Sequence, residues 1–127
     1  MIGYVTVGTN DFERAVAFYD ALLGELGASR FMSGDTFVAW AVDGQPPGFS
    51  VTTPFDGNPA TVGNGCMVAL SAGSTEQVDR VWRRALDLGG SDEGPAGPRD
   101  DGFYAGYFRD LDGNKLSVFT MPAEQAG

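Results

Sequence analysis

The two halves of the chain repeat one order of residues, and this repeat limits the possible folds more than any other feature. Matching residues lie 63 positions apart: Tyr4 with Met67, Phe12 with Thr75, Glu13 with Glu76, Phe18 with Val81, Tyr19 with Trp82 and Leu23 with Leu86. Residues 49–51 match residues 116–118 at an offset of 67, because the second half has a longer loop. Internal similarity of this kind predicts two copies of one structural unit.

The first half is predicted to form a strand, a helix and three further strands. Its strands are residues 2–7, 28–32, 36–42 and 49–53, and the apolar stripe of its helix comprises Phe12, Ala15, Val16, Tyr19, Leu22, Leu23 and Leu26. Residues 9–11, Thr-Asn-Asp, are typical of a helix start. Residues 54–65 are rich in Gly, Pro and Asn, which indicates a linker.

The second half follows the same order. Its strands are predicted at residues 66–71, 103–109 and 115–120, and its helix stripe comprises Val78, Val81, Trp82, Ala85 and Leu86. Ser74 begins a capping box with Gln77. Residues 91–102 are expected to be an extended loop with at most one weak edge strand, because Pro95 and Pro98 interrupt it.

These elements predict an α+β fold made of two tandem βαβββ modules in a single domain. Module one spans residues 1–53, the linker 54–65, module two 66–121 and a short tail 122–127. Each helix covers one apolar face of its sheet, so the other faces are expected to curve around a shared cavity. The expected architecture is an open, eight-stranded, barrel-like sheet, with a ligand pocket between the modules.

Strand alternation predicts which side chains face that pocket. Phe37 and Trp40 fall on opposite faces of their strand, and we expect Trp40 to point inward. The predicted pocket residues are Tyr4, Thr6, Trp40, Ser50, Thr52, Met67, Ala69, Ala105, Tyr107, Ser117 and Phe119. The alternative is that these aromatic side chains only fill the interior and leave no ligand site.

The absence of histidine from the sequence removes several kinds of chemistry. It excludes Ser-His-Asp and Cys-His nucleophiles and metal sites that use imidazole. Cys66 is the only cysteine and lies in the apolar run 66–70, so we expect a buried thiol without a disulfide.

A net charge of -9 makes nucleic acids and anionic membranes poor partners and favours a cationic ligand. The first residues enter a strand pattern at once and carry no signal-peptide or transmembrane pattern, so a cytoplasmic location is expected.

Three short motifs have simpler explanations than a functional site. Asp110, Asp112 and Asn114 resemble the start of a calcium loop, but Gly113 comes too early and Met121 replaces the bidentate Glu. A hairpin turn is therefore predicted there. The carboxylates at 100–101 are expected to be solvated, and the Gly-Asn-Gly at 63–65 lacks the residues of a phosphate-binding loop.

Three segments, residues 5–20, 89–99 and 102–114, closely resemble the vicinal oxygen chelate superfamily of glyoxalases, bleomycin-resistance proteins and extradiol dioxygenases. The resemblance extends over essentially the whole chain. It implies the paired-module fold, and it implies a metal at four inner positions, which correspond here to Tyr4, Ser50, Met67 and Ser117. None of these residues offers a carboxylate or an imidazole, so we expect neither a metal nor another cofactor.

The leading hypothesis is a metal-free protein of the bleomycin-resistance type that binds or sequesters a hydrophobic or cationic aromatic compound. The resemblance implies that Tyr107 contacts ligand and that the protein forms a homodimer. The alternatives are a lyase or isomerase with Tyr4 or Tyr107 as proton donor, a glyoxalase-like lyase with metal bound elsewhere, and a purely interacting subunit.

Overall fold

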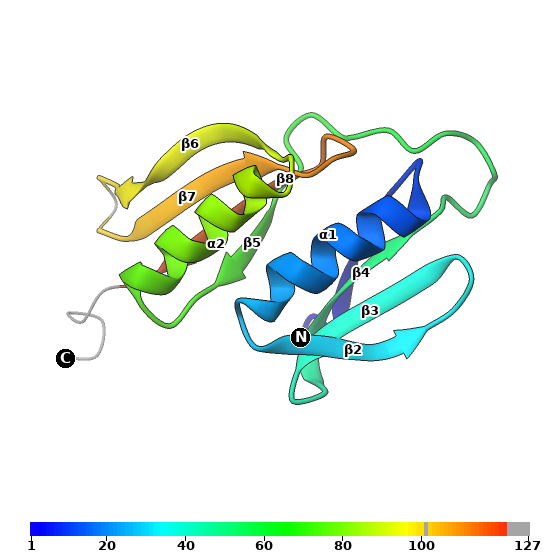
Figure 1. Cartoon of the computed structure of the whole chain (residues 1–127), viewed down its shortest axis with the longest axis horizontal. Coiled ribbons are helices and arrows are strands. Elements are labelled where there is room, and N and C mark those ends of the chain that lie inside the picture. Colours follow the sequence, from blue (N-terminus) through cyan, green and yellow to red (C-terminus); the bar gives the residue numbers. More distant parts are fainter. Residues whose placement is uncertain (101, 122–127) are drawn as a thin grey trace. The chain divides into compact units, whose positions relative to one another are not determined.

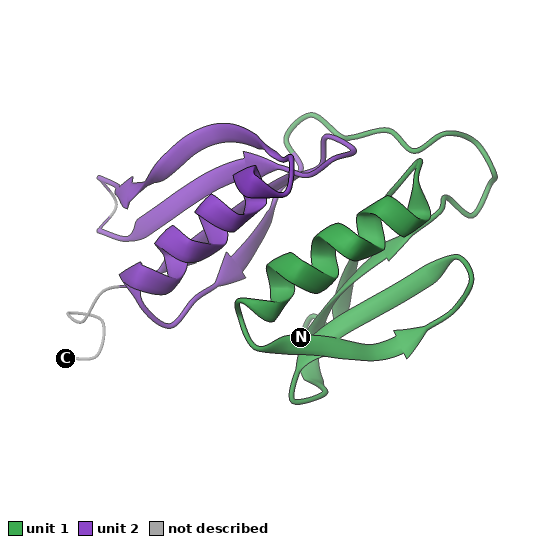
Figure 2. Ribbon diagram, viewed as in Figure 1, with its two compact units in different colours: residues 1–65 green, residues 66–127 purple. Residues whose placement is uncertain are grey.

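The computed structural model describes residues 1–100 and 102–121. It divides into unit 1, Met1–Gly65, and unit 2, which begins at Cys66 (Figure 2). In each unit one helix lies across one face of a four-stranded sheet (Figure 1). The α+β class and the two βαβββ modules are thus confirmed, and the described strands are hydrogen-bonded as two sheets of four, not one of eight. The predicted tail, 122–127, lies outside the described residues.

Unit 1 contains the five elements that the first half predicts. They are β1 (Tyr4–Gly8), α1 (Phe12–Gly24), β2 (Ala28–Ser33), β3 (Phe37–Val42) and β4 (Gln45–Thr52). The strand order is β1-β4-β3-β2, with β1 parallel to β4 and the other pairs antiparallel. The first and last strands of the module therefore lie side by side, and Thr6 is directly opposite Ser50.

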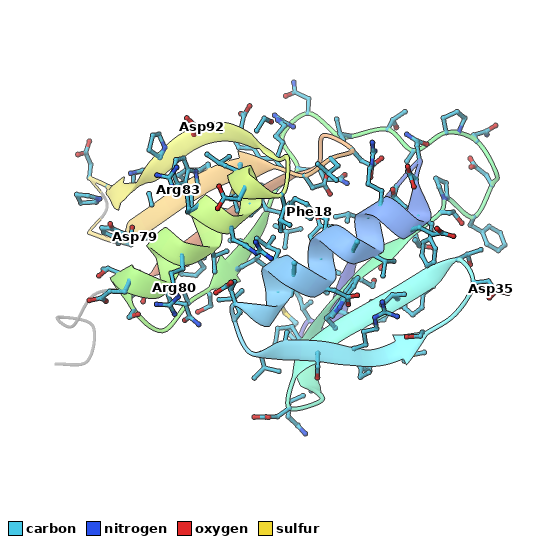
Figure 3. The ribbon with its side chains drawn as sticks, in the orientation of Figure 1. Phe18, Asp35, Asp79, Arg80, Arg83 and Asp92 are labelled. Atoms are coloured by element: carbon cyan, nitrogen blue, oxygen red, sulfur yellow. The ribbon has the colours of Figure 1, made fainter. Side chains whose placement is uncertain are left out.

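Helix α1 begins at a side-chain cap and buries one broad face. The carboxylate of Asp11 accepts a hydrogen bond from the backbone N–H of Arg14 at 3.2 Å. The buried side chains are Ala15, Val16, Phe18, Tyr19, Leu22 and Leu23. Phe18, labelled in Figure 3, was not in the predicted stripe; it lies three residues after Ala15 and four before Leu22, on one edge of the same face.

Unit 2 repeats this plan. Its elements are β5 (Val68–Ser71), α2 (Thr75–Asp87), β6 (Ser91–Pro98), β7 (Tyr104–Arg109) and β8 (Lys115–Thr120), with the strand order β5-β8-β7-β6. The Ser74 hydroxyl accepts from the backbone N–H of Gln77 at 3.1 Å, as predicted for the helix cap. The Gln77 side chain accepts from the N–H of Gly73 at 2.7 Å, one residue before the usual partner in a capping box. Neither described helix has the length and hydropathy of a membrane-spanning segment.

Strand β6 corrects the expectation of an extended loop. The strand pairs antiparallel with β7 at both of its ends and at Gly94, with register shifts on either side of Gly94. Pro95 and Pro98 are tolerated because β6 is an edge strand, where a missing N–H need not break a ladder on both sides. The prolines thus correctly indicated an edge strand, but the strand covers most of the segment that was expected to be a loop.

Cys66 is exposed, so the prediction of a buried thiol is wrong. The apolar run at 66–70 suggested a strand throughout, but β5 starts only at Val68. Cys66 therefore precedes the sheet and does not reach the core under α2.

The segment between β7 and β8 is a hairpin turn, as predicted. The Asp110 carboxylate accepts hydrogen bonds from the backbone N–H groups of Asp112 and Asn114, both at 2.9 Å, and from the Asn114 side-chain amide at 2.9 Å. These contacts use the carboxylate to close the turn, which explains the Asp-x-Asp-x-Asn spacing without a calcium ion.

Candidate functional site

Each sheet has a proximal face, packed against its helix, and a distal face on the opposite side. In unit 1 the Phe49 ring lies 4.7 Å from the ring of Tyr19 on α1, so Phe49 is proximal. Its neighbour Ser50 on β4 is therefore distal, and so is Thr6 of β1, which lies directly opposite Ser50. Alternation places Tyr4 and Thr52 on the same distal face, as the sequence predicts.

Ser50 forms the centre of this distal face. Its hydroxyl lies 2.6 Å from the Thr6 hydroxyl and donates a hydrogen bond to the Val5 carbonyl at 3.0 Å. Ser50 is 0% exposed, whereas Tyr4 is 61% exposed. The Ser50 hydroxyl thus links β4 to β1, a role that the sequence did not reveal because register decides which hydroxyls meet.

Trp40 corrects the prediction for β3, because it lies on the proximal face. Its indole N–H donates to the Asp20 carboxylate of α1 at 2.8 Å, and its ring is 5.9 Å from that of Tyr19. The aromatic cluster under α1 and this single polar partner hold Trp40 at 1% exposure. Alternation then assigns Phe37 to the distal face.

The distal face of unit 2 carries Tyr107. A Cβ atom on the preceding Gly106 would lie only 2.9 Å from the Trp82 ring of α2, so Gly106 is proximal and Tyr107 is distal. Tyr107 of β7 is directly opposite Ser117 of β8, and Ser117 is in turn opposite Ala69 of β5. The remaining predicted residues on this face are Ala105, which pairs with Phe119, and Met67, which precedes β5.

Three side chains beside these residues were missed by the sequence analysis. The Phe103 ring packs edge-on against Phe119 at 6.3 Å. The Arg99 guanidinium and the Lys115 ammonium lie 5.3 Å and 5.8 Å from the centre of the Tyr107 ring. Alternation along β8 could have identified Lys115, since it shares the parity of Ser117. Arg99 gave no such signal, because it folds back from the end of β6.

The four positions that correspond to metal ligands do not form a suitable donor set. Ser50 uses its hydroxyl within the sheet, Met67 offers a soft thioether, and Tyr4 and Ser117 offer neutral oxygens. Divalent cations such as zinc and manganese prefer carboxylate, imidazole or thiolate ligands. In residues 1–100 and 102–121, no three carboxylate or thiol side chains come together as a possible metal site either.

A separate groove of about 290 Å³ lies in unit 1, between α1 and strands β2 and β3. It is lined by Phe12, Glu13, Val16, Ala17, Asp20, Arg30, Gly34 and Val38. Arg30 donates two hydrogen bonds to the Asp20 carboxylate, at 3.0 and 2.6 Å. The Arg30 contacts, and then the Trp40 N–H, keep the pKa of Asp20 below its usual value against the opposing effect of burial. None of the predicted pocket residues lines this groove.

The Tyr104 side chain lies apart from Tyr107 on β7. Its hydroxyl donates to Asp79 of α2 at 2.7 Å. This contact with a carboxylate raises the pKa of Tyr104, since the hydrogen bond favours the protonated phenol. Tyr104 thus joins helix to sheet and is not a candidate base at neutral pH.

The comparisons with known proteins agree with this arrangement of paired modules. The family model described as "Glyoxalase/Bleomycin resistance protein/Dioxygenase superfamily" matches residues 1–118. A solved glyoxalase/bleomycin resistance protein from Albidiferax ferrireducens T118 is 39% identical, with a TM-score of 0.88; the match covers 96% of this chain and 99% of that one.

More distant structures share the fold alone. Lactoylglutathione lyase from Agrobacterium tumefaciens is 20% identical with a TM-score of 0.70, over 100% of this chain and 96% of its own. Hypothetical protein SA1046 from S. aureus is 21% identical with a TM-score of 0.73, over 94% and 92% of the two chains. No curated protein matches the sequence. The family match over residues 1–118 and the repeated βαβββ modules show that the chain belongs to the glyoxalase/bleomycin resistance protein/dioxygenase superfamily.

Proposed function

We propose that the protein binds or sequesters a hydrophobic or aromatic small molecule at the distal faces of its sheets, without metal chemistry. The observation that carries this proposal is the state of the four metal-ligand positions. Ser50 is committed to hydrogen bonds within its sheet, and none of the four offers a carboxylate or imidazole. The Tyr4 and Tyr107 rings on the same faces offer apolar area to a ligand, as aromatic side chains commonly do in binding sites.

The charge of the ligand and the oligomeric state belong to this proposal as well. A net charge of -9 favours a cationic aromatic compound at long range. We further propose a homodimer, on the grounds of family membership. Native mass spectrometry of the purified chain checks the dimer, and a monomer at micromolar concentration would contradict it.

A thermal-shift screen of amphiphilic antibiotics and aromatic metabolites tests binding. A ligand present at a hundredfold excess over its dissociation constant adds about 2.7 kcal/mol to the stability of the folded state. We expect Tyr107→Leu to abolish the shift. Phe55→Leu is the matched control, because Phe55 is an exposed aromatic residue in the segment between the modules, and it should keep the shift.

Two results would contradict the proposed function. One is a screen in which no compound shifts the midpoint. The other is stoichiometric nickel, zinc, iron or manganese in the purified protein by elemental analysis, which would favour the enzymatic alternative, a lyase or isomerase of the glyoxalase kind.

A further inference from the structure

Two positively charged side chains converge on the Tyr107 ring in unit 2. Arg99 lies 5.3 Å and Lys115 lies 5.8 Å from its centre. Lys115 is the only lysine in the sequence. It follows the hairpin turn at the start of β8 and shares the distal face with Ser117, two residues later. The chain thus places its one lysine ammonium group beside an aromatic ring on the face where we propose binding.

Three of the other basic side chains have a carboxylate partner. Arg14 pairs with Asp11, Arg30 with Asp20, and Arg109 with Glu93 of β6 at 3.4 Å. Over residues 1–100 and 102–121, neither Arg99 nor Lys115 forms an ion pair. The sequence has 17 acidic residues for 8 basic ones, so carboxylates are plentiful. Arg99 and Lys115 therefore bring two positive charges to Tyr107 that no carboxylate of the described residues pairs with.

Among the described residues, Arg99 is held in place by carbonyl groups rather than by a carboxylate. Its guanidinium donates to the carbonyls of Pro95, Gly97 and Pro98 at 2.7, 3.0 and 3.2 Å. A guanidinium has five N–H donors, so at least two have no acceptor in residues 1–100 and 102–121. Carbonyl contacts fix the group without neutralising its charge, and this reduces the entropy lost when an anion binds.

The Lys115 ammonium adds three N–H donors, which make no hydrogen bond within the described part of the chain.

We propose that the distal face of unit 2, at Tyr107, binds the anionic group of an aromatic compound, a carboxylate or a phosphate ester. This inference rests on the proposed small-molecule binding and reverses the ligand charge expected from the sequence. The total charge acts through solvent and is screened over about 8 Å at physiological ionic strength, whereas Lys115 and Arg99 would touch the ligand.

Isothermal titration calorimetry of the full chain with four ring compounds tests whether the site prefers an anionic or a cationic ligand. Benzoate and phenyl phosphate are anionic, benzyl alcohol is neutral and benzylamine is cationic. We expect at least one of the two anions to bind about tenfold or more tightly than benzylamine, since charge-assisted hydrogen bonds are the strong ones. The stronger of the two anions then identifies the carboxylate or the phosphate as the group recognised.

Lys115→Gln should weaken binding of the preferred anion about fivefold or more and leave benzyl alcohol unchanged. Arg83→Gln is the matched control: Arg83 lies on α2 (Figure 3), over the Trp82 ring at 5.4 Å, so it removes an equal charge and an equivalent ring contact. It should leave binding of the anion unchanged. Thermal unfolding of both variants checks that they fold.

Several outcomes would overturn the inference. If benzylamine bound as tightly as the anions, the preference for an anionic group would be wrong, but the proposed small-molecule binding would still stand. An equal loss in both variants would assign the effect to net charge rather than to this face. No detectable binding of any of the four compounds would also overturn it, and the wider thermal-shift screen would then decide the proposed function separately.

Discussion

Asp20 on α1 contacts both a surface cation and a buried indole. Its carboxylate accepts two hydrogen bonds from Arg30 and one from Trp40, which is almost fully buried on the proximal face of β3. Arg30 and Trp40 lie opposite each other in the register between β2 and β3. One carboxylate therefore ties α1 to two neighbouring strands.

The contribution of Asp20 to stability should depend on pH. Because its pKa in the folded state is lowered, the stabilisation is present above the unfolded pKa of about 3.9 and is lost as the pH falls through the folded value. Asp20→Asn cannot titrate. We expect the difference in unfolding free energy between wild type and this variant to be constant from about pH 7 to 5 and to shrink below about pH 4. Urea denaturation across this range measures it.

Two further variants separate the contacts of Asp20. In an Arg30→Gln background the pH-dependent difference should diminish, because Arg30 is the largest cause of the lowered pKa. Asp20→Ala should lower the unfolding free energy by about 1–3 kcal/mol relative to wild type, since it leaves the buried indole N–H of Trp40 without its acceptor. A pH-independent difference between wild type and Asp20→Asn would contradict the assignment.

At the scale of single residues, the sequence predicted the sheet face on which a side chain lies better than it predicted the residues that this side chain contacts. Alternation correctly placed Tyr107 away from α2, because β7 keeps a regular register with β8. It failed for Trp40, where the choice against Phe37 depended on a hydrogen bond with a helix residue twenty positions away. The position of Arg99 over Tyr107 was equally out of reach, since the carbonyls that orient the guanidinium come from the irregular strand β6.

At the scale of elements, the two helices were the most predictable, because each has an apolar stripe and a side-chain cap. Asp11 and Ser74 cap α1 and α2 as their positions indicate. Strand β6 was the least predictable, because two prolines and two glycines disguise it in the sequence. The strand forms because it pairs with β7, and the sequence of residues 91–98 by itself does not show that this pairing is favourable.

Removing the cap of α2 should lower stability measurably. Ser74→Ala deletes the hydroxyl that accepts from the Gln77 N–H, and such losses cost about 1 kcal/mol. Ser74→Asp keeps an acceptor and adds a favourable negative charge at the helix start, so it should retain wild-type stability. Chemical denaturation of the three proteins compares them. Equal stability of wild type and Ser74→Ala would show that the Gly73–Gln77 contact suffices as a cap.

On the scale of the whole molecule, the internal repeat correctly predicted two units with the same order of elements. Each unit has its own helix, sheet and buried aliphatic or aromatic core. The cavity predicted between the modules stays a prediction. Periodicity could identify both modules because it reflects burial within each of them, but it contains no information on how one module contacts the other.

The segment between β4 and β5 should be the first site of proteolysis. Phe55 has a relative exposure of 107% and lies outside any strand or helix, so it is accessible to chymotrypsin. We expect an initial cut after Phe55, giving fragments 1–55 and 56–127 by mass spectrometry. Phe55→Ser is the control and should slow this cut. An initial cut within a strand, for example after Phe31 of β2, would contradict the expected order.

The irregular edge strand β6 also affects how copies of the protein can meet. An exposed edge with evenly spaced N–H groups is a template on which a strand from another molecule can add, leading to fibres. Pro95 and Pro98 each lack an N–H group, and the register shifts next to Gly94 interrupt the spacing of the others. Addition of a strand from a second copy to the sheet at β6 is therefore disfavoured, which lowers the tendency of this edge to aggregate.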